Sequence, residues 1–394
     1  MAMAKIGATD KGGVRRLALT DLDAEGRRLF IRWAEEIGCI VTVDAIGNIF
    51  ARREGTDPAR APVTTGSHLD SQPSGGKYDG TYGVLAGLEV LRTMVDHNIQ
   101  TRAPVEVVVW TNEEGSRFTP VMMGSGVYAG LFDIDATLDR VDIDGVRVGD
   151  ALAAIGFLGD RTRLGRPIGA YFEAHIEQGP VLEDAATTIG VVTGGLGLRW
   201  YDVRAIGQDS HAGPTPMGLR RDALLAACEV AVAVNRIALD HAPHGRGTVG
   251  YMKVAPNSRN VVPGQVDFSI DLRHSDNATL DRMEAAMHAA CARIGAAHGV
   301  TMTVTPATQF PVVRFGDECV SAVRDAAAQR GYSHMDIVSG AGHDAFYIAR
   351  MAPAAMIFVP CAGGLSHNEL EAVDPAHLEA GANVLMDAMV RAAV

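Results

Sequence analysis

His68 and Asp70 are the first residues of the chain whose types and spacing suggest metal chemistry. They lie two residues apart, directly after an apolar stretch. In an extended segment, side chains two residues apart point to the same side. We therefore expect the Asp70 carboxylate to accept the ring N–H of His68, which would make the imidazole a better metal ligand. The alternative is a histidine at a strand end followed by a turn aspartate.

Asp79 is flanked by glycines, in the sequence GGKYDG at residues 75–80. Glycines allow the backbone to approach other groups closely, so this carboxylate could point into a site. The alternative interpretation is the N-cap of the following helix, which is the common role of an aspartate in this position.

Glu113 and Glu114 form an adjacent acidic pair at the end of a buried apolar run. Two such carboxylates repel each other unless they share a cation or a proton. Because neighbouring strand residues point in opposite directions, one glutamate could bind a metal ion while the other acts as a general base. Two solvated turn residues are the alternative.

His175 and His367 are further candidate ligands. His175 follows the apolar run at residues 168–172, and His367 follows a glycine-containing loop that begins at Cys361. Each alone is compatible with an ordinary surface histidine. In combination with the acidic residues, they complete a set of imidazole and carboxylate groups.

Apolar, β-branched runs at residues 61–66, 105–110 and 352–359 predict buried strands, and helical spacing at 83–95 predicts a helix between the first two. This order indicates a right-handed parallel crossover in an open α/β sheet. Ligands bind beyond the carboxyl ends of the strands in such sheets. His68 and the Glu113–Glu114 pair fall at these ends.

The middle of the chain predicts a different domain with a β-α-β-β-α-β order, typical of a ferredoxin-like α+β unit. Its strands are expected at 198–206, 247–254, 266–273 and 300–305, and its helices at 219–238 and 278–297. We expect this domain at 194–312, inserted into an α/β domain that comprises 1–193 and 313–394. Helices at 318–330, 344–350 and 376–393 complete the α/β domain.

The composition favours a cytoplasmic enzyme without a nucleic-acid partner. The formal net charge of -12 argues against binding a phosphate backbone. Five scattered cysteines without a C-x-x-C pair suggest reduced thiols. We find neither a signal peptide nor a stretch of roughly 20 apolar residues that would span a membrane.

The candidate ligands together indicate two metal ions. Mixed imidazole and carboxylate ligands suit zinc above all, and also manganese, cobalt or nickel. Two ions roughly 3.5 to 4 Å apart need a carboxylate that binds both. We expect Asp79 to be this bridge.

The sequence resembles the M20-type co-catalytic metallohydrolases, in the branch of N-carbamoyl-L-amino acid hydrolases, β-ureidopropionases and allantoate amidohydrolases. The resemblance covers nearly the whole chain and is specific as an ordered set of motifs. The motifs are GSHLDSQP (66–73), GGKYDG (75–80), TNEEGSRF (111–118), EAHIEQGP (173–180), DSHAG (209–213), SRNVVP (258–263), GAGHDA (340–345) and SHNE (366–369). Relatives usually have additional residues ahead of a segment like 2–7, which suggests a shortened or misassigned start and affects no ligand.

The resemblance implies that His68 and His175 bind one metal ion and that Glu114 and His367 bind the other, with Asp79 between them. It also implies two divalent ions and hydrolysis of the carbamoyl C–N bond of N-carbamoyl amino acids to the amino acid, ammonia and carbon dioxide. Allantoate amidohydrolase is the nearest alternative, followed by an M20 aminoacylase or peptidase.

The resemblance further implies that Glu113 is the general base and acid, that Asp70 orients His68, and that the peptide bond after Asp79 is cis, which Gly80 would ease.

On the inserted domain, the resemblance implies that His211 and Asn260 polarise the substrate carbonyl and that Arg273 binds its carboxylate. On the α/β domain, it implies that Gln178 contacts the carbamoyl end. These residues of the inserted domain are expected to reach the active site of a partner subunit, so that a homodimer is required. A metal-dependent binding protein without activity is the rival from another class. An intact Glu113 argues against it, because a binding protein needs no base.

Overall fold

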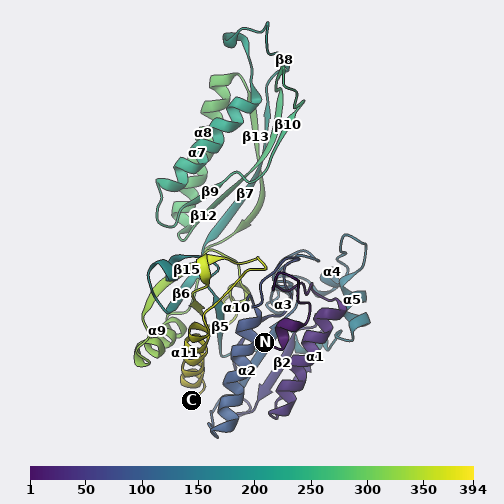
Figure 1. Ribbon diagram of the computed structural model, residues 1–394, viewed down its shortest axis with the longest axis vertical. Coiled ribbons are helices and arrows are strands. Elements are labelled where there is room, and N and C mark those ends of the chain that lie inside the picture. The colour runs from purple at the N-terminus through teal and green to yellow at the C-terminus, as the bar shows by residue number, and fades with distance from the viewer. The chain divides into compact units, whose positions relative to one another are not determined.

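The chain folds into two compact units, shown in Figure 1. The structure, a computed structural model, describes residues 1–394. The sheet unit comprises Met1–Gly194 and Arg314–Val394, and the inserted unit comprises Gly195–Val313. Each unit has its own sheet and its own buried core.

The sheet unit is built on a nine-stranded sheet in the order β1-β2-β4-β3-β5-β16-β6-β14, with β15 paired to β6. The strands are β1 (Ile40–Val43), β2 (Ile49–Arg53), β3 (Val63–His68), β4 (Val105–Trp110), β5 (Ala170–Ile176), β6 (Ile189–Gly195), β14 (Val313–Arg314), β15 (His334–Ser339) and β16 (Ala354–Val359). The central strands β4, β3, β5 and β16 are parallel, whereas β2 and β6 flank them in antiparallel orientation. The predicted α/β class with a mainly parallel sheet is confirmed.

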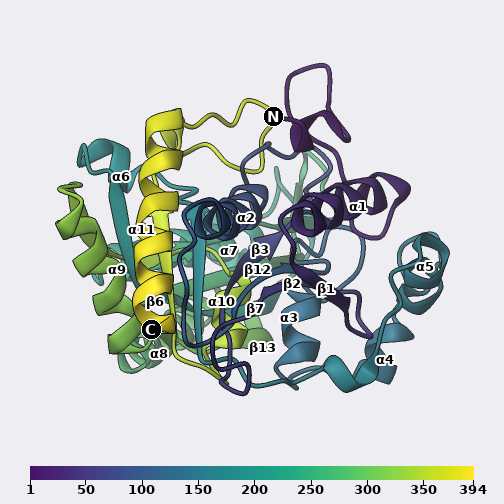
Figure 2. The same ribbon diagram turned by 90° about the horizontal axis from the view of Figure 1, so that it is seen from below.

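Every residue of the four central strands is buried, which explains their continuous apolar sequences. Helices α2, α11 and α9 pack next to one another, and α3 and α10 pack together against β4, β5 and β16 (Figure 2). The helices of this unit are η1 (Met3–Lys5), α1 (Asp21–Glu36), α2 (Thr81–Asp96), α3 (Met123–Tyr128), α4 (Ile134–Leu138), α5 (Val148–Ile155), η2 (Arg161–Arg163), α6 (Val181–Asp184), α9 (Asp317–Gln329), α10 (Asp344–Ile348), η4 (Ala362–Gly364) and α11 (Pro375–Ala393). No helix of the chain is both long and apolar enough to cross a membrane.

The inserted unit contains a sheet in the order β10-β12-β7-β13, in which all neighbouring strands are antiparallel, and β9 pairs with β12. Its elements are β7 (Gly197–Ile206), β8 (Ser210–His211), η3 (Met217–Leu219), α7 (Ala223–Leu239), β9 (Arg246–Thr248), β10 (Met252–Ala255), β11 (Val261–Val262), β12 (Gln265–His274), α8 (Asn277–His298) and β13 (Thr301–Phe310). One helix follows the first long strand and the other follows β12, which is the order of a split β-α-β unit. The core lies between the two helices and the sheet.

Three predicted strands differ from the structure. The strand expected at 300–305 continues to Phe310. The strand expected to end at residue 172 continues to Ile176, so that His175 lies within β5. Its polar residues remain in the strand because they find partners: Glu173, for example, accepts hydrogen bonds from Ser67 and Tyr171. The strand expected at 247–254 is divided into β9 and β10, which both pair with β12.

Candidate metal centre

The candidate ligands of the sheet unit lie at the carboxyl ends of the four parallel strands. His68 is the last residue of β3, and His175 is the last but one of β5. Glu113 and Glu114 follow β4, and His367 follows β16 and η4. Asp79 comes from the loop that enters α2. The parallel order of the strands therefore gathers residues that are far apart in the sequence.

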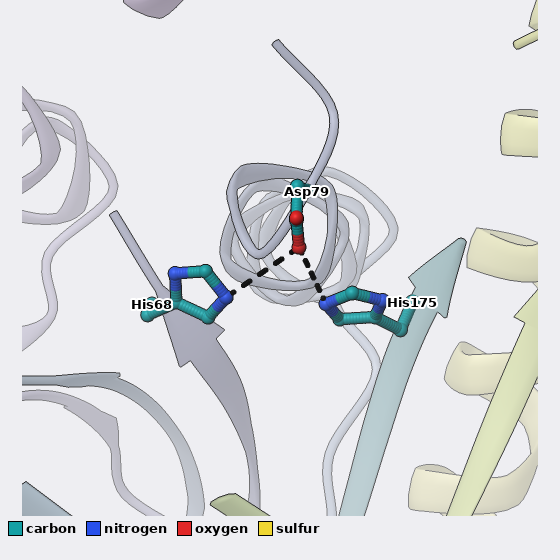
Figure 3. Close-up of side chains that lie close together, drawn as sticks. All are labelled: His68, Asp79 and His175. Carbon is teal, nitrogen blue, oxygen red and sulfur yellow. Dashed lines mark ion pairs between the residues drawn. The ribbon is translucent and has the colours of Figure 1, made fainter. Parts of the chain in front are cut away.

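Asp79 faces His68 and His175 with one carboxylate oxygen, as Figure 3 shows. The distances from Asp79 Oδ1 are 3.2 Å to His175 Nε2 and 3.7 Å to His68 Nε2. All three side chains are buried. This arrangement brings together three residues that were predicted to bind one metal ion.

Both imidazoles are oriented by main-chain oxygens on their other ring nitrogen. His68 Nδ1 lies 2.9 Å from the carbonyl oxygen of Asp70, and His175 Nδ1 lies 2.9 Å from that of Ile176. A carbonyl only accepts hydrogen bonds, so each Nδ1 carries a proton, and a ring that is neutral presents its Nε2 lone pair to Asp79. His175 Nε2 also accepts the N–H of Gly80 at 3.2 Å. Lone pairs facing a carboxylate need a proton or a cation between them.

The other oxygen of Asp79 belongs to a second group. His367 Nε2 lies 3.3 Å from Asp79 Oδ2 and 3.3 Å from Glu114 Oε2. Glu114 is buried and also accepts hydrogen bonds from the main chain and side chain of Gln72. Asp79 is thus shared by two groups of possible metal ligands, one on each oxygen.

The charges in this centre depend strongly on one another. Burial alone would raise the pKa of Asp79, but the hydrogen bonds from His175 and His367 outweigh it and hold this pKa well below its usual range. The contacts with Asp79 and Glu114 raise the pKa of His367 to about 10. Protonated His175 and His367 place positive charge next to the carboxylates, where a metal ion would place it. The residues fit two divalent ions.

Glu113 lies beside the first group without being part of it. Its Oε2 is 3.5 Å from His68 Nε2, and the residue is buried. Burial, followed by the charges of Asp344 and Glu114, raises the pKa of Glu113 well above its usual range. A carboxyl group with a raised pKa next to a metal centre suits proton transfer.

The structure corrects the expected contact of Asp70. Its carboxylate accepts the main-chain N–H groups of Glu113, at 3.3 Å, and of Glu114, at 3.2 Å. The nearest carboxylate oxygen is 3.9 Å from His68 Nδ1, and the carbonyl oxygen of Asp70 takes that position instead. Asp70 therefore contacts His68 through its main chain and the two glutamates through its side chain.

The expectation of a cis peptide bond after Asp79 is also wrong in this structure. The three cis bonds precede prolines at 120, 243 and 256. Gly80 instead adopts a φ of +60°, and a Cβ atom at this position would overlap the ring of His68. Glycine is needed here because the backbone passes directly over the imidazole.

Gln178 lies in the same centre, with a φ of +60°. Its Nε2 donates hydrogen bonds to Asp79 Oδ2 at 3.1 Å and to Ser366 Oγ at 3.2 Å. Its Oε1 is buried and has no hydrogen-bond partner. The amide therefore retains an acceptor that a ligand's N–H groups could use.

Three buried residues close to this centre had no role predicted from the sequence. Glu173 accepts hydrogen bonds from Ser67, Tyr171 and the main chain of Ala345. The ring of His343 packs against that of His175, with 4.5 Å between centroids. Glu371 accepts the main-chain N–H groups of Tyr78 and Asp79. Glu173 and His343 lie within the motifs at 173–180 and 340–345 that carry the family resemblance, whereas no pattern in the sequence distinguishes Glu371.

His211 and Asn260 lie together in the inserted unit. His211 pairs with Val261 in the short ladder between β8 and β11, and the N–H of Ala212 donates to the carbonyl oxygen of Asn260 at 2.8 Å. The N–H of Gly213 donates to His211 Nδ1 at 3.1 Å. Neutral His211 therefore carries its proton on Nε2 and can donate it to a carbonyl oxygen. Both side chains are exposed.

Arg273 lies apart from this pair. It is near the end of β12, whereas the β8–β11 ladder lies beyond the beginning of that strand. Arg273 lies eight positions after Gln265, which corresponds to about 26 Å of strand. Arg273 pairs with Arg246 of β9. Figure 1 shows β8 and β9 at opposite ends of the unit. In this structure the Arg273 guanidinium pairs with Asp271, at 2.8 Å.

Comparison with known proteins identifies similar sequences and folds. The model of peptidase family M20/M25/M40 matches residues 64–391. An N-carbamoyl-L-amino-acid amidohydrolase from Rhizobium meliloti is 48% identical over 393 residues, which cover 100% of this chain and 94% of that protein. The crystal structure of an amidase of the hydantoinase/carbamoylase family from Burkholderia multivorans has a TM-score of 0.97 at 58% identity and covers 100% of this chain and 96% of the other. An allantoate amidohydrolase from Bacillus subtilis is 34% identical and covers 99% of this chain and 95% of that protein.

Proposed function

The chain belongs to peptidase family M20/M25/M40, and on this premise we propose that it is a two-metal hydrolase of N-carbamoyl amino acids. The observation that carries the proposal is the position of Asp79, whose two carboxylate oxygens face separate groups of imidazole and carboxylate ligands. The reaction is hydrolysis of the carbamoyl C–N bond of L-α-amino acid or β-alanine derivatives. The relative from Rhizobium meliloti supports this substrate class.

We assign the first ion to His68, His175 and Asp79, and the second to Glu114, His367 and Asp79. Zinc suits this ligand set best, and manganese, cobalt or nickel suit it as well. When bound, the ions make water more acidic and polarise the substrate carbonyl.

We assign the proton transfer to Glu113. It removes a proton from the attacking water, whose oxygen forms a bond with the ureido carbon. The C–N bond to the amino acid then breaks, and Glu113 returns the proton to the leaving nitrogen. The products are the amino acid and carbamate, which decomposes to ammonia and carbon dioxide. The raised pKa of Glu113 supports its role both in taking the proton from water and in returning it to the leaving nitrogen.

Four further residues are proposed to bind the substrate. Gln178 contacts the carbamoyl end with the Oε1 atom that has no other partner. His211 donates its Nε2 proton to the carbonyl oxygen, with Asn260 beside it, and stabilises the charge that develops there. Arg273 binds the carboxylate, for which the planar guanidinium is well suited.

The separation of Arg273 from His211 and Asn260 supports a homodimer. About 26 Å of strand is longer than an N-carbamoyl amino acid, so the two groups of one chain do not reach a single substrate together. A second copy of the chain can supply one of the groups. We therefore propose that residues of the inserted unit complete the site of a partner subunit. Five free cysteines support a cytoplasmic location.

Allantoate amidohydrolase is the second candidate, supported by the relative from Bacillus subtilis. Allantoate also has a carboxylate and ureido groups, so the same centre accommodates its chemistry. An aminoacylase or peptidase would act on an amide without the second ureido nitrogen. Such a substrate would make no use of the Gln178 acceptor.

An ammonia-release assay tests the proposal. The purified protein is incubated with N-carbamoyl-L-amino acids, N-carbamoyl-β-alanine and allantoate, each with and without a chelator. We expect chelator-sensitive release of ammonia from a carbamoyl amino acid at a higher kcat/KM than from allantoate. A preference for allantoate would favour the second candidate. Turnover that survives complete removal of metal would contradict the two-metal proposal.

A further inference from the structure

Glu371 joins two loops of the metal centre that are distant in the sequence. One loop, residues 76–80, carries Asp79, and the other, residues 365–371, carries His367. Glu371 Oε1 accepts the N–H of Tyr78 at 2.8 Å and the N–H of Asp79 at 3.2 Å. Glu371 Oε2 lies 3.2 Å from the hydroxyl of Ser366. One buried carboxylate thus holds the backbone of Asp79 and the neighbour of His367.

Ser366 extends this connection to the side chain of Asp79. Its Oγ lies 3.3 Å from Asp79 Oδ2. A serine hydroxyl has a single proton, so it can donate to only one of the two carboxylates at a time. An ion bound to Asp79 would compete with the hydroxyl for this oxygen, which favours Glu371 as the acceptor for the hydroxyl.

The carboxylate of Glu371 is closely surrounded by the two loops. Only 2% of Glu371 is exposed. A Cβ atom on Gly76 would overlap this carboxylate, so a larger residue at position 76 would displace it from its present position. Asp79 and His367 are two of the three proposed ligands of the second ion, and their relative position depends on this contact.

We propose that Glu371 is a positioning residue that fixes Asp79 and His367 for the second metal ion. This inference rests on the proposed two-metal function and deepens it. Glu371 itself binds no ion and transfers no proton; it acts through the N–H groups of Tyr78 and Asp79 and through Ser366. Residues that orient metal ligands typically contribute about 10- to 100-fold to metal affinity.

The test measures metal affinity directly, without substrate. Wild type, Glu371→Ala and Glu371→Gln are titrated with zinc against a chromophoric chelator, and bound zinc is counted by elemental analysis. We expect Glu371→Ala to bind the second ion about 10- to 100-fold more weakly and to keep the first. The glutamine amide can still accept both N–H groups and donate to Ser366 Oγ. We expect it to restore the affinity to within about threefold of wild type.

Asp44 provides a matched control in the same unit. It is also a buried carboxylate that accepts two main-chain N–H groups, those of Ile46 and Asn48, and one side-chain donor. We expect Asp44→Ala to lower the melting temperature without changing the affinity for either ion. Equal loss of the second ion in both alanine variants would show a general effect of destabilisation and would overturn the proposal.

Gly76→Ala tests the same contact with Glu371 still present. The added methyl group displaces the carboxylate. We therefore expect this variant to lower the affinity for the second ion to the same extent as Glu371→Ala. In the Glu371→Ala background the methyl group has nothing to displace, and the double variant should bind like the single one. This comparison remains informative if Glu371→Ala folds poorly.

Unchanged affinity for the second ion in both Glu371→Ala and Gly76→Ala would overturn the inference. A wild-type protein that binds two ions but releases no ammonia from carbamoyl amino acids would contradict the proposed substrate and leave this inference standing. A wild-type protein that holds a single ion would refute both the two-metal centre and the role of Glu371.

Discussion

The carboxylate of Asp70 accepts the main-chain N–H of Glu113, with 3.3 Å between the two atoms. It accepts the N–H of Glu114 as well. The loop after β4 therefore depends on this side chain for the position of both glutamates. His68 does not depend on it, because the carbonyl oxygen of Asp70 holds its ring.

Asp70→Asn is expected to shift Glu113 and Glu114 and to leave the position of His68 unchanged. An asparagine has only one accepting oxygen, so its NH2 group would face one of the two N–H groups and push the loop away. We expect weaker binding of the second ion and at least an approximately tenfold lower kcat, because Glu114 and Glu113 shift. Zinc titration and steady-state kinetics measure the two effects. Preferential loss of the ion bound by His68 and His175 would show that the side chain supports the histidine after all.

Glu113→Gln is expected to abolish turnover while both ions remain bound. The amide has the size of the carboxylate but cannot accept the proton of the attacking water. We expect kcat to fall by about 100- to 10,000-fold, the usual contribution of a general base. Elemental analysis should find the same two ions as in the wild type. A kcat within a few-fold of wild type would remove Glu113 from the proposed role.

The strands that carry the ligands were predictable because burial on both faces leaves a clear apolar pattern. Residues at 61–66, 105–110 and 352–359 fall largely within β3, β4 and β16. The end of β5 was not predictable in this way. Its Glu173 and His175 are polar, and they remain in the strand because of partners at distant positions, such as Ser67.

The candidate ligands could be identified from residue types and motifs, but their hydrogen-bond partners could not. The spacing of His68 and Asp70 suggested a carboxylate contact, whereas the chain turns and offers the carbonyl oxygen instead. Glu371 accepts N–H groups from residues 292 and 293 positions earlier, and no local pattern predicts such a contact. Long-range contacts of loops depend on the complete fold.

Removal of the metal ions is expected to destabilise the protein. Asp70, Asp79, Glu113 and Glu114 are all buried within the same centre. Without cations, their charges are balanced only by protons and by the histidines, so the folded state loses favourable interactions. A ligand present at 100 times its dissociation constant stabilises a protein by about 2.7 kcal/mol, which sets the scale of the effect for each ion.

Calorimetry with and without a chelator measures this effect. We expect a lower melting temperature after chelation and full recovery when zinc is added back. His367→Ala should show only part of the decrease, because the ion held by His68 and His175 remains. An unchanged melting temperature in protein shown by elemental analysis to be free of metal would contradict a contribution of the ions to stability.

Arg273→Lys is expected to weaken substrate binding with little effect on the metal centre. The guanidinium is held beside Asp271, with Nε and one NH2 group directed at that carboxylate. This orientation presents a planar donor group that also matches a substrate carboxylate, whereas the lysine ammonium cannot form two parallel hydrogen bonds. Hydrogen bonds to charged groups contribute about 1.5 to 3 kcal/mol, so KM should rise by about 10- to 100-fold.

Arg204→Lys is a suitable control because Arg204 also pairs with an aspartate on the same sheet, Asp267, at 2.6 Å. It should leave KM unchanged. A carbamoyl amino acid amide provides a second control, since it lacks the carboxylate and should be hydrolysed equally poorly by wild type and Arg273→Lys. If Arg273→Lys lowers kcat and leaves KM as in the wild type, Arg273 does not bind the carboxylate in the ground state, and the substrate must be held by other residues.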